Sequence, residues 1–293
     1  MPDGPPPAPA VQRIRLRYTK RGRLRFASHR DFQRAFERAL RRARVPVAYS
    51  AGFTPHPRVS YANAAPTGVA SEAEYLEIAL VEERIPAQLR ALLDASLPDG
   101  MEVLEAVEAR STGFAERLQA SVWQVRLGGV GQAEADQAVR RFLDAPAVKV
   151  ERLAKNGLRT FDARGPVITL QVVDSLPTSG ESTARRNERD PKNYVTYIEQ
   201  NFDITARRGC AILRLVVRHV TPAVRPDDVL SGLCAVAELT LPVPAEVTRL
   251  AQGPLDEEFG TVADPLEPDR GAATAVSLAV PGSPAAPAPV STA

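Results

Sequence analysis

Arginine is concentrated in one part of the chain, together with two of its three histidines. Residues 11–60 carry fourteen basic side chains and only two acidic ones, Asp31 and Glu37. An ordinary protein surface mixes both signs, so this bias favours an anionic partner. Guanidinium groups suit phosphates because their planar fork donates two parallel hydrogen bonds. The chemistry that this stretch indicates is therefore the binding of a polyanion such as RNA.

Part of this arginine-rich stretch has helical spacing, with arginines on the face opposite Phe32, Phe36 and Leu40. The residues expected to contact nucleic acid are Arg23, Arg25, Arg30, Arg34, Arg38, Arg41, Arg42 and Arg58. Flanking strands are expected to add Arg15 and Arg17. Aromatic residues that could stack on bases lie nearby, and they are Tyr18, Tyr49, Phe53 and Tyr61. The alternative is a helix face that is only solvated.

His29 and His56 are the candidate catalytic residues, since each lies in a loop beside the predicted helix, which could bring the two loops together. Three roles stay open for them. They could be structural or contact RNA, they could act as general acids in metal-free RNA cleavage, or they could ligate a metal. Metal ligation would need a carboxylate from Asp31, Glu72 or Glu74, and nothing in the spacing demands one. We therefore predict no metal site.

Other chemistry has weaker support in the sequence. Ser28, His29 and Asp31 are too close together at a helix start to form a hydrolase triad, so Ser28 and Asp31 are expected to cap the helix. His219 follows a strand alone and has no predicted role. The sequence contains no Walker loop, no dinucleotide-binding glycine motif and no cysteine triplet for an iron–sulfur cluster. We therefore predict no cofactor, and catalysis by the chain alone is left open.

Cysteine content and hydropathy indicate the compartment. Cys210 and Cys234 are too few and too far apart for a disulfide framework, so we expect two buried thiols in a reducing environment. The proline-rich start does not have the pattern of a signal peptide, and no run approaches the roughly 20 apolar residues of a membrane span. We predict a soluble cytoplasmic protein that does not bind a membrane.

Periodicity along the chain predicts strands interleaved with two helices in each half. Strands are expected at residues 13–19, 24–26, 47–49, 58–62, 74–80, 101–107, 121–127, 148–153, 167–173 and 211–217. Helices are expected from Ser28 or Asp31 to Pro46 and at residues 86–97, 133–143 and 227–237. The predicted fold class is α+β, with two ferredoxin-like α/β sandwich domains in tandem and disordered termini.

The 293-residue chain divides into four expected parts. They are a disordered leader at 1–10, a basic domain at 11–110, a second α+β domain at 119–240 with a flexible loop at 175–193, and a disordered Pro/Ala-rich acidic tail at 244–293. The leader and tail contain too few large apolar residues to offset the entropy lost on ordering.

Residues 13–78 resemble the radical-SAM-linked domain, an uncharacterised bacterial domain that occurs fused to a radical SAM protein or as a separate chain beside one. The resemblance rests on seven local patterns. They are Lys20-x-Gly22, Phe26, Ser28-His29-x-Asp31, Arg38–Arg42, Tyr49-Ser50-x-Gly52-Phe53, Pro55-His56-Pro57 and Ser71-Glu72-x-Glu74-Tyr75. Beyond about residue 105 the resemblance fades. It implies association with a radical SAM protein and supplies no catalytic residues.

Three functions follow. The first is an accessory RNA-binding or substrate-presenting partner of a radical SAM enzyme, in tRNA or rRNA modification. The second is a metal-independent RNA-processing endonuclease that uses His29 and His56, in a layout similar to CRISPR RNA-processing enzymes. The third is an adaptor that binds only protein, with the arginines against an acidic patch.

Overall fold

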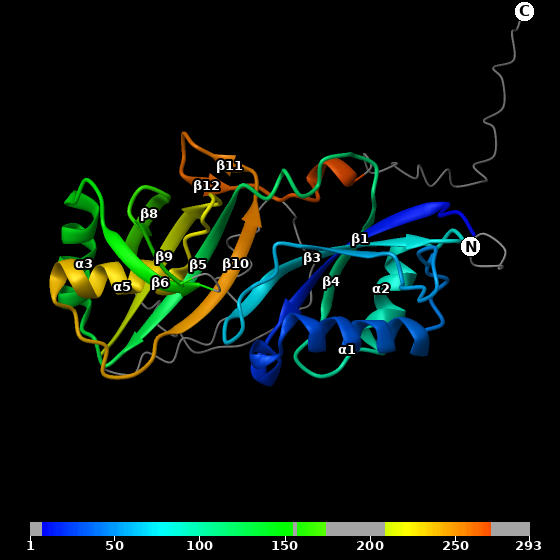
Figure 1. Cartoon of the computed structure of the whole chain (residues 1–293), viewed down its shortest axis with the longest axis horizontal. Coiled ribbons are helices and arrows are strands. Elements are labelled where there is room, and N and C mark those ends of the chain that lie inside the picture. The colour runs from blue at the N-terminus through cyan, green and yellow to red at the C-terminus, as the bar shows by residue number, and fades with distance from the viewer. Residues whose placement is uncertain (1–7, 155–156, 174–208, 271–293) are drawn as a thin grey trace, which may run out of the picture.

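The computed structural model of the chain describes residues 8–154, 157–173 and 209–270 (Figure 1). The N-terminal half contains β1 (Gln12–Lys20), the short 3₁₀ helix η1 (Gly22–Phe26), α1 (His29–Arg42), β2 (Val59–Ala62), β3 (Ala70–Leu80), α2 (Pro86–Asp94) and β4 (Val103–Glu108). The C-terminal half contains β5 (Ala120–Gly128), α3 (Gln132–Asp144), β6 (Lys149–Ala154), β7 (Gly157–Asp162), β8 (Val167–Val173), β9 (Cys210–Arg218), α5 (Pro226–Ala237) and β10 (Glu246–Gly253). The strands β11 (Leu255–Asp256) and β12 (Thr261–Val262) and the 3₁₀ helix η3 (Glu267–Asp269) follow.

One eight-stranded sheet runs through both halves in the order β4-β1-β3-β10-β5-β9-β8, with β2 beside β3. All neighbours are antiparallel except β3 and β10, which are parallel. The first half contributes the order β4-β1-β3-β2 and the second contributes β10-β5-β9-β8. The fold is therefore mixed α/β, with a large mixed sheet whose two halves meet at the pairing of β3 with β10.

Each half buries an apolar core between its strands and its own helices. In the first half Ile14 and Leu16 of β1 pack in one cluster with Phe32, Phe36 and Leu40 of α1. The second half packs its strands β5, β8 and β9 with α3 and α5 in a separate cluster. The period of two along β1 and the helical period along α1 produce the first core, as the sequence predicts.

The prediction that the tail at 244–293 is disordered is wrong for the part that the structure describes, residues 244–270. Residues 246–253 form β10, which lies inside the sheet between β3 and β5. β5 pairs with it from Glu246 to Gly253, and β3 pairs with it at Thr248 and Arg249. The buried side chain of Arg249 donates to Glu74 of β3. Pairing with strands distant in sequence thus orders a segment that has few apolar residues of its own. The predicted loop at 175–193, residues 1–7 of the leader and residues 271–293 lie outside the described part of the chain.

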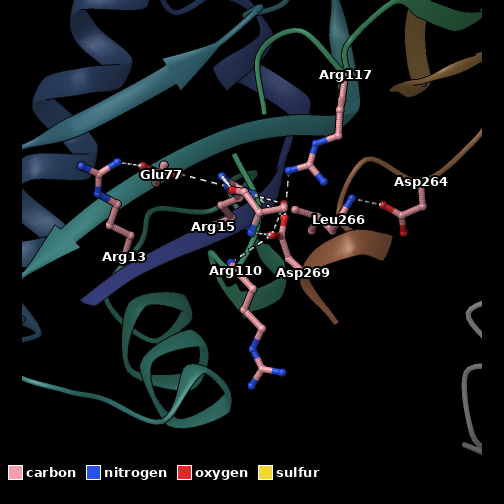
Figure 2. Close-up of polar contacts among 9 residues, drawn as sticks. Arg13, Arg15, Glu77, Arg110, Arg117, Asp264, Leu266 and Asp269 are labelled. Carbon is pink, nitrogen blue, oxygen red and sulfur yellow. Dashed lines mark hydrogen bonds and ion pairs between the residues drawn. The ribbon is translucent and has the colours of Figure 1, made fainter. Parts of the chain in front are cut away.

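The segment after β12 crosses to the first half of the sheet and is held there by Asp269 (Figure 2). One Asp269 carboxylate oxygen accepts from Arg15 at 2.5 Å and from Arg117 at 3.1 Å. The other accepts from the backbone N–H groups of Arg110 and Ser111, at 3.0 and 2.9 Å, and from the Ser111 hydroxyl. Burial alone would raise the pKa of Asp269, but hydrogen bonds from Ser111 and Arg15 outweigh it and lower that pKa to about 2.

His219, to which the sequence assigned no role, joins several segments. Its Nδ1–H donates to the carbonyl of Leu118 at 2.6 Å, and its Nε2 accepts from the Ser121 hydroxyl at 2.7 Å. The side chain of Ser121 is fully buried, so this serine is not placed to attack a substrate. Burial is the main cause that lowers the pKa of His219 below 6.5, and the positive charge of Arg249 adds to it. The contacts identify His219 as a neutral structural histidine.

Acidification is expected to destabilise the protein through His219. Because its pKa is lower in the folded chain, the unfolded chain binds more protons as the pH falls below about 6.5. The free energy of unfolding should therefore fall more from pH 7 to pH 5 in the wild-type protein than in His219→Gln, which cannot titrate at this position. Urea unfolding at each pH measures the difference. A wild-type protein that gains stability relative to the variant on acidification would contradict this assignment.

Candidate nucleic-acid interface

Helix α1 separates an apolar face from an arginine face. Ser28 caps its first turn by accepting from the backbone N–H of Asp31 at 3.2 Å, as the sequence predicts. Phe32, Phe36 and Leu40 are buried against the sheet. The exposed arginines of α1 are Arg30, Arg34, Arg38, Arg41 and Arg42, and we call them the arginine face. At 1.5 Å per residue, the first four of them extend over about 17 Å of helix.

Acidic side chains compensate the arginine face only weakly. Arg34 lies 4.0 Å from Asp31, and Arg41 lies 3.9 Å from Glu37. Both distances are at the limit of an ion pair, and exposed pairs of this kind contribute at most about 1 kcal/mol. Within the described ranges, Arg30 and Arg38 have neither a hydrogen bond nor an ion pair. The face therefore carries positive charge that a phosphate could neutralise.

The arginines at positions 23 and 25 adjoin the N-terminal end of α1. The sequence predicted an extended segment at residues 24–26, but residues 22–26 form the 3₁₀ helix η1, which begins at Gly22 with a positive φ of 54°. Arg23 is exposed and Arg25 is half-buried, with its guanidinium 4.7 Å from the ring centre of Phe26. Phe26 itself is 60% exposed, so this end of the interface combines charge with an accessible ring.

A hairpin at residues 47–58 follows the C-terminal end of α1 and carries Arg58 and His56, both exposed. The expected strand at 47–49 is reduced to single bridges from Val47 to Leu80 and from Tyr49 to Pro57. The backbone bond from Arg58 N–H to the carbonyl of Ala48, at 2.8 Å, closes the hairpin. The backbone of Arg58 is thus fixed by pairing with residues 48 and 79.

The two candidate catalytic histidines are not brought together. His29 opens α1, where its ring meets Tyr61 edge-on at 5.2 Å and its Nε2 lies 3.1 Å from the amide of Gln33. His56 precedes β2 and lies towards the other end of the helix, which is about 20 Å long. No hydrogen bond or ring contact joins the two histidines, and the described ranges contain no cluster of three potential metal ligands. The sequence predicts that the two loops meet, but β2 runs antiparallel to α1 and separates them.

Arg15 and Arg17 do not extend the arginine face. Ile14 and Leu16 occupy the helix-facing side of β1, so the alternating arginines point to the opposite side, where both are buried. Arg15 pairs with Asp269 and Glu77, and Arg17 donates to the carbonyl of Glu72. Their role is structural.

Of the aromatic residues predicted to stack on bases, some are buried in the fold and others are exposed. Tyr18 is buried and stacks on Phe32, while half-buried Tyr61 packs against the rings of α1. Tyr49 and Phe53 are exposed and stay available for stacking. The exposed ring of Phe26 was missed, and its position directly after Arg25 in a glycine-initiated turn was the signal that could have revealed it.

A cleft of about 600 Å³ lies where β1 and β3 meet β10 and β5. Its charged lining residues are Arg17, Arg21, Arg25, Arg126, Glu72, Glu102 and Glu246. Arg21 forms hydrogen bonds with Glu72 and Glu102, and Arg126 lies 3.9 Å from Glu246. Because acids offset most of its basic groups, this cleft is less suited to a polyanion than the arginine face.

Two further expectations concern chemistry and compartment. Cys210 and Cys234 are free thiols, but both are half-buried rather than fully buried. Among the helices of the described ranges, none has the length and apolar character needed to cross a membrane.

The family model for an uncharacterized protein conserved in bacteria (DUF2344) matches residues 13–226, which include the arginine face and most of the second half. No curated protein matches the chain.

Proposed function

We propose that this chain, which belongs to the DUF2344 family of uncharacterized proteins conserved in bacteria, is an accessory RNA-binding protein that presents tRNA or rRNA to a radical SAM enzyme. The observation that carries the proposal is the arginine face of α1, with five exposed guanidinium groups against two distant carboxylates. Arginines without close acidic partners along one helix favour binding to a chain of phosphates, because this binding releases the counterions condensed on the RNA.

The choice of RNA over an acidic protein rests on what lies beside the arginine face. Exposed aromatic rings accompany the charge at both ends of α1, with Phe26 before the helix and Tyr49 and Phe53 after it. RNA-binding proteins use rings of this kind to stack on unpaired bases.

The positions of the histidines support an accessory role. General acid–base cleavage of RNA needs groups that can reach the same phosphate. His29 and His56 lie towards opposite ends of α1, so no observation favours the endonuclease alternative. The radical SAM partner is proposed from the resemblance of residues 13–78 to the radical-SAM-linked domain. The cytoplasmic location is proposed from the two free cysteines, Cys210 and Cys234.

We also propose that each half is a ferredoxin-like unit, in line with the tandem expected from the sequence. The first unit would take residues 11–110, and the second would take residues 119–240 with β10 added. Support comes from the strand orders β4-β1-β3-β2 and β10-β5-β9-β8, each with two crossover helices. The hairpin of β6 and β7 would then be an insertion in the second unit.

The proposal is tested by binding and by co-purification. Fluorescence anisotropy at low salt should show that the full chain binds labelled tRNA or rRNA fragments and does not bind poly-glutamate. Co-expression with radical SAM proteins of the same bacterium, recognised by their cluster-binding cysteines, should give a complex that retains RNA. Binding of poly-glutamate with no binding of RNA would contradict the proposal and would favour the protein adaptor.

A further inference from the structure

The hairpin at residues 47–58 presents a phenylalanine to solvent at its tip. Phe53 is 88% exposed, and Tyr49 at the base of the hairpin is 42% exposed. Burying a phenylalanine side chain would stabilise the fold by about 1.5–3 kcal/mol, yet this ring stays exposed to solvent. A ring left this accessible is available to a ligand.

Hydrogen bonds close the hairpin on both sides of the turn that carries Phe53. The backbone N–H of Ser50 donates to the carbonyl of His56 at 2.9 Å, and the N–H of His56 donates back to the Ser50 hydroxyl at 3.0 Å. The base of the hairpin is fixed to the sheet by the bond from Ala48 N–H to the carbonyl of Ala79. Gly52, with a φ of 122°, makes the turn immediately before Phe53. The hairpin is therefore closed by the hydrogen bonds between Ser50 and His56, which lie on either side of the tip.

Arginines flank the hairpin in the sequence on both sides. Arg58 lies on its returning strand, and the chain enters it from Arg41, Arg42 and Arg44 at the end of α1, all of them exposed. Stacking rings next to a basic track are the combination by which proteins bind single-stranded nucleic acid. A duplex cannot use the ring, because its bases are already stacked and paired inside the helix.

We propose that the RNA segment bound by this chain is single-stranded and that an unpaired base stacks on Phe53 while the neighbouring phosphates lie along the arginine face. Tyr49 supplies a second, less exposed ring at the base of the same hairpin. This inference rests on the proposed function and narrows its substrate class to unpaired regions of tRNA or rRNA, such as loops and ends.

The test compares a labelled 12-nucleotide oligouridine with a blunt RNA duplex of the same length, by fluorescence anisotropy with the full-length chain. Phe53→Ala should weaken binding of the single strand by roughly five-fold to more than a hundred-fold, since stacking contributes about 1–3 kcal/mol per base. Binding of the duplex should change less than two-fold. Phe53→Tyr keeps an aromatic face and should restore most of the affinity for the single strand.

Phe259→Ala is the matched control, because Phe259 is also exposed, at 69%, but lies between β11 and β12. Equal affinities of Phe53→Ala and Phe259→Ala for the single strand would overturn the stacking inference. If the two phenylalanine variants bind equally, the proposed function is still supported when the arginine variants described below lose binding of both the single strand and the duplex. Absence of any RNA binding by the wild-type chain would instead reject the proposed function itself.

A spectroscopic readout separates stacking from a change in the fold. In Phe53→Trp the new indole is at the tip, whereas the native Trp123 is buried. Oligouridine should quench the additional fluorescence of this variant as a base covers the ring. Unchanged fluorescence at saturating oligouridine would contradict a base on residue 53.

Discussion

Reversing the charge at Arg30, Arg34 and Arg38 to glutamate is expected to weaken RNA binding at 50 mM salt by about 1,000-fold or more. These side chains follow one another at intervals of four residues and therefore lie along one face of α1. Each contributes about ten-fold at this salt concentration if it neutralises one phosphate, and reversal adds repulsion. Electrophoretic mobility shift or anisotropy with labelled tRNA measures the effect.

A second triple variant with the same change in net charge is the control. Arg13, Arg84 and Arg110 are exposed, lie away from the arginine face and form only surface ion pairs. Their replacement by glutamate should lower RNA affinity much less than the reversal on α1. Far-ultraviolet circular dichroism should show that both variants fold. Equal losses of affinity in the two variants would mean that overall charge, rather than the arginine face, governs binding.

Replacing Asp269 by alanine is expected to lower the free energy of unfolding by about 3–5 kcal/mol. The Asp269 side chain is fully buried and accepts from Arg15, whose side chain is only 4% exposed. Removing the carboxylate leaves a buried guanidinium without its closest negative charge, and it also frees the backbone N–H groups of Arg110 and Ser111. Urea unfolding followed by circular dichroism measures the loss.

Two further measurements make the Asp269 prediction specific. Glu267→Ala removes a neighbouring carboxylate that is 71% exposed and should cost less than about 1 kcal/mol. Adding Arg15→Met to Asp269→Ala should recover part of the loss, because it removes the uncompensated charge. A cost below about 1 kcal/mol for Asp269→Ala would show that the segment after β12 is not anchored through this carboxylate.

Acid should weaken the same anchor. Because the folded pKa of Asp269 is about 2 and its ordinary value is 3.8, the stabilisation is present above pH 4 and is lost as the pH falls towards 2. The Asp269→Ala variant should lack this part of the pH dependence.

Local patterns in the sequence predict those elements whose cause is local. The cap at Ser28 and the apolar spacing from Phe32 to Leu40 predict α1, and the alternation of Ile14 and Leu16 predicts β1. The same alternation shows that Arg15 and Arg17 share a face, but it does not show what covers that face. The covering residue, Asp269, is 254 positions from Arg15 in sequence.

The other differences between prediction and structure also come from contacts between residues distant in sequence. Strand β10 contains Arg249 amid few large apolar residues, and its partner Glu74 is 175 positions away, so a window of residues cannot identify it as a central strand. The arginine face was predictable, since exposed and buried positions of α1 follow from one helical period. The separation of His29 from His56 was not, because it depends on the direction of β2 relative to α1.

The central claim, that the arginine face neutralises RNA phosphates, is tested most directly by salt. We would measure the logarithm of the binding constant for oligouridine against the logarithm of salt concentration, for the wild-type chain and for Arg30, Arg34 and Arg38 replaced by alanine. Three lost contacts on a single strand should reduce the steepness of the wild-type line by about 2, at 0.7 for each contact. Parallel lines for the two proteins would mean that these arginines do not touch phosphate and would contradict the account.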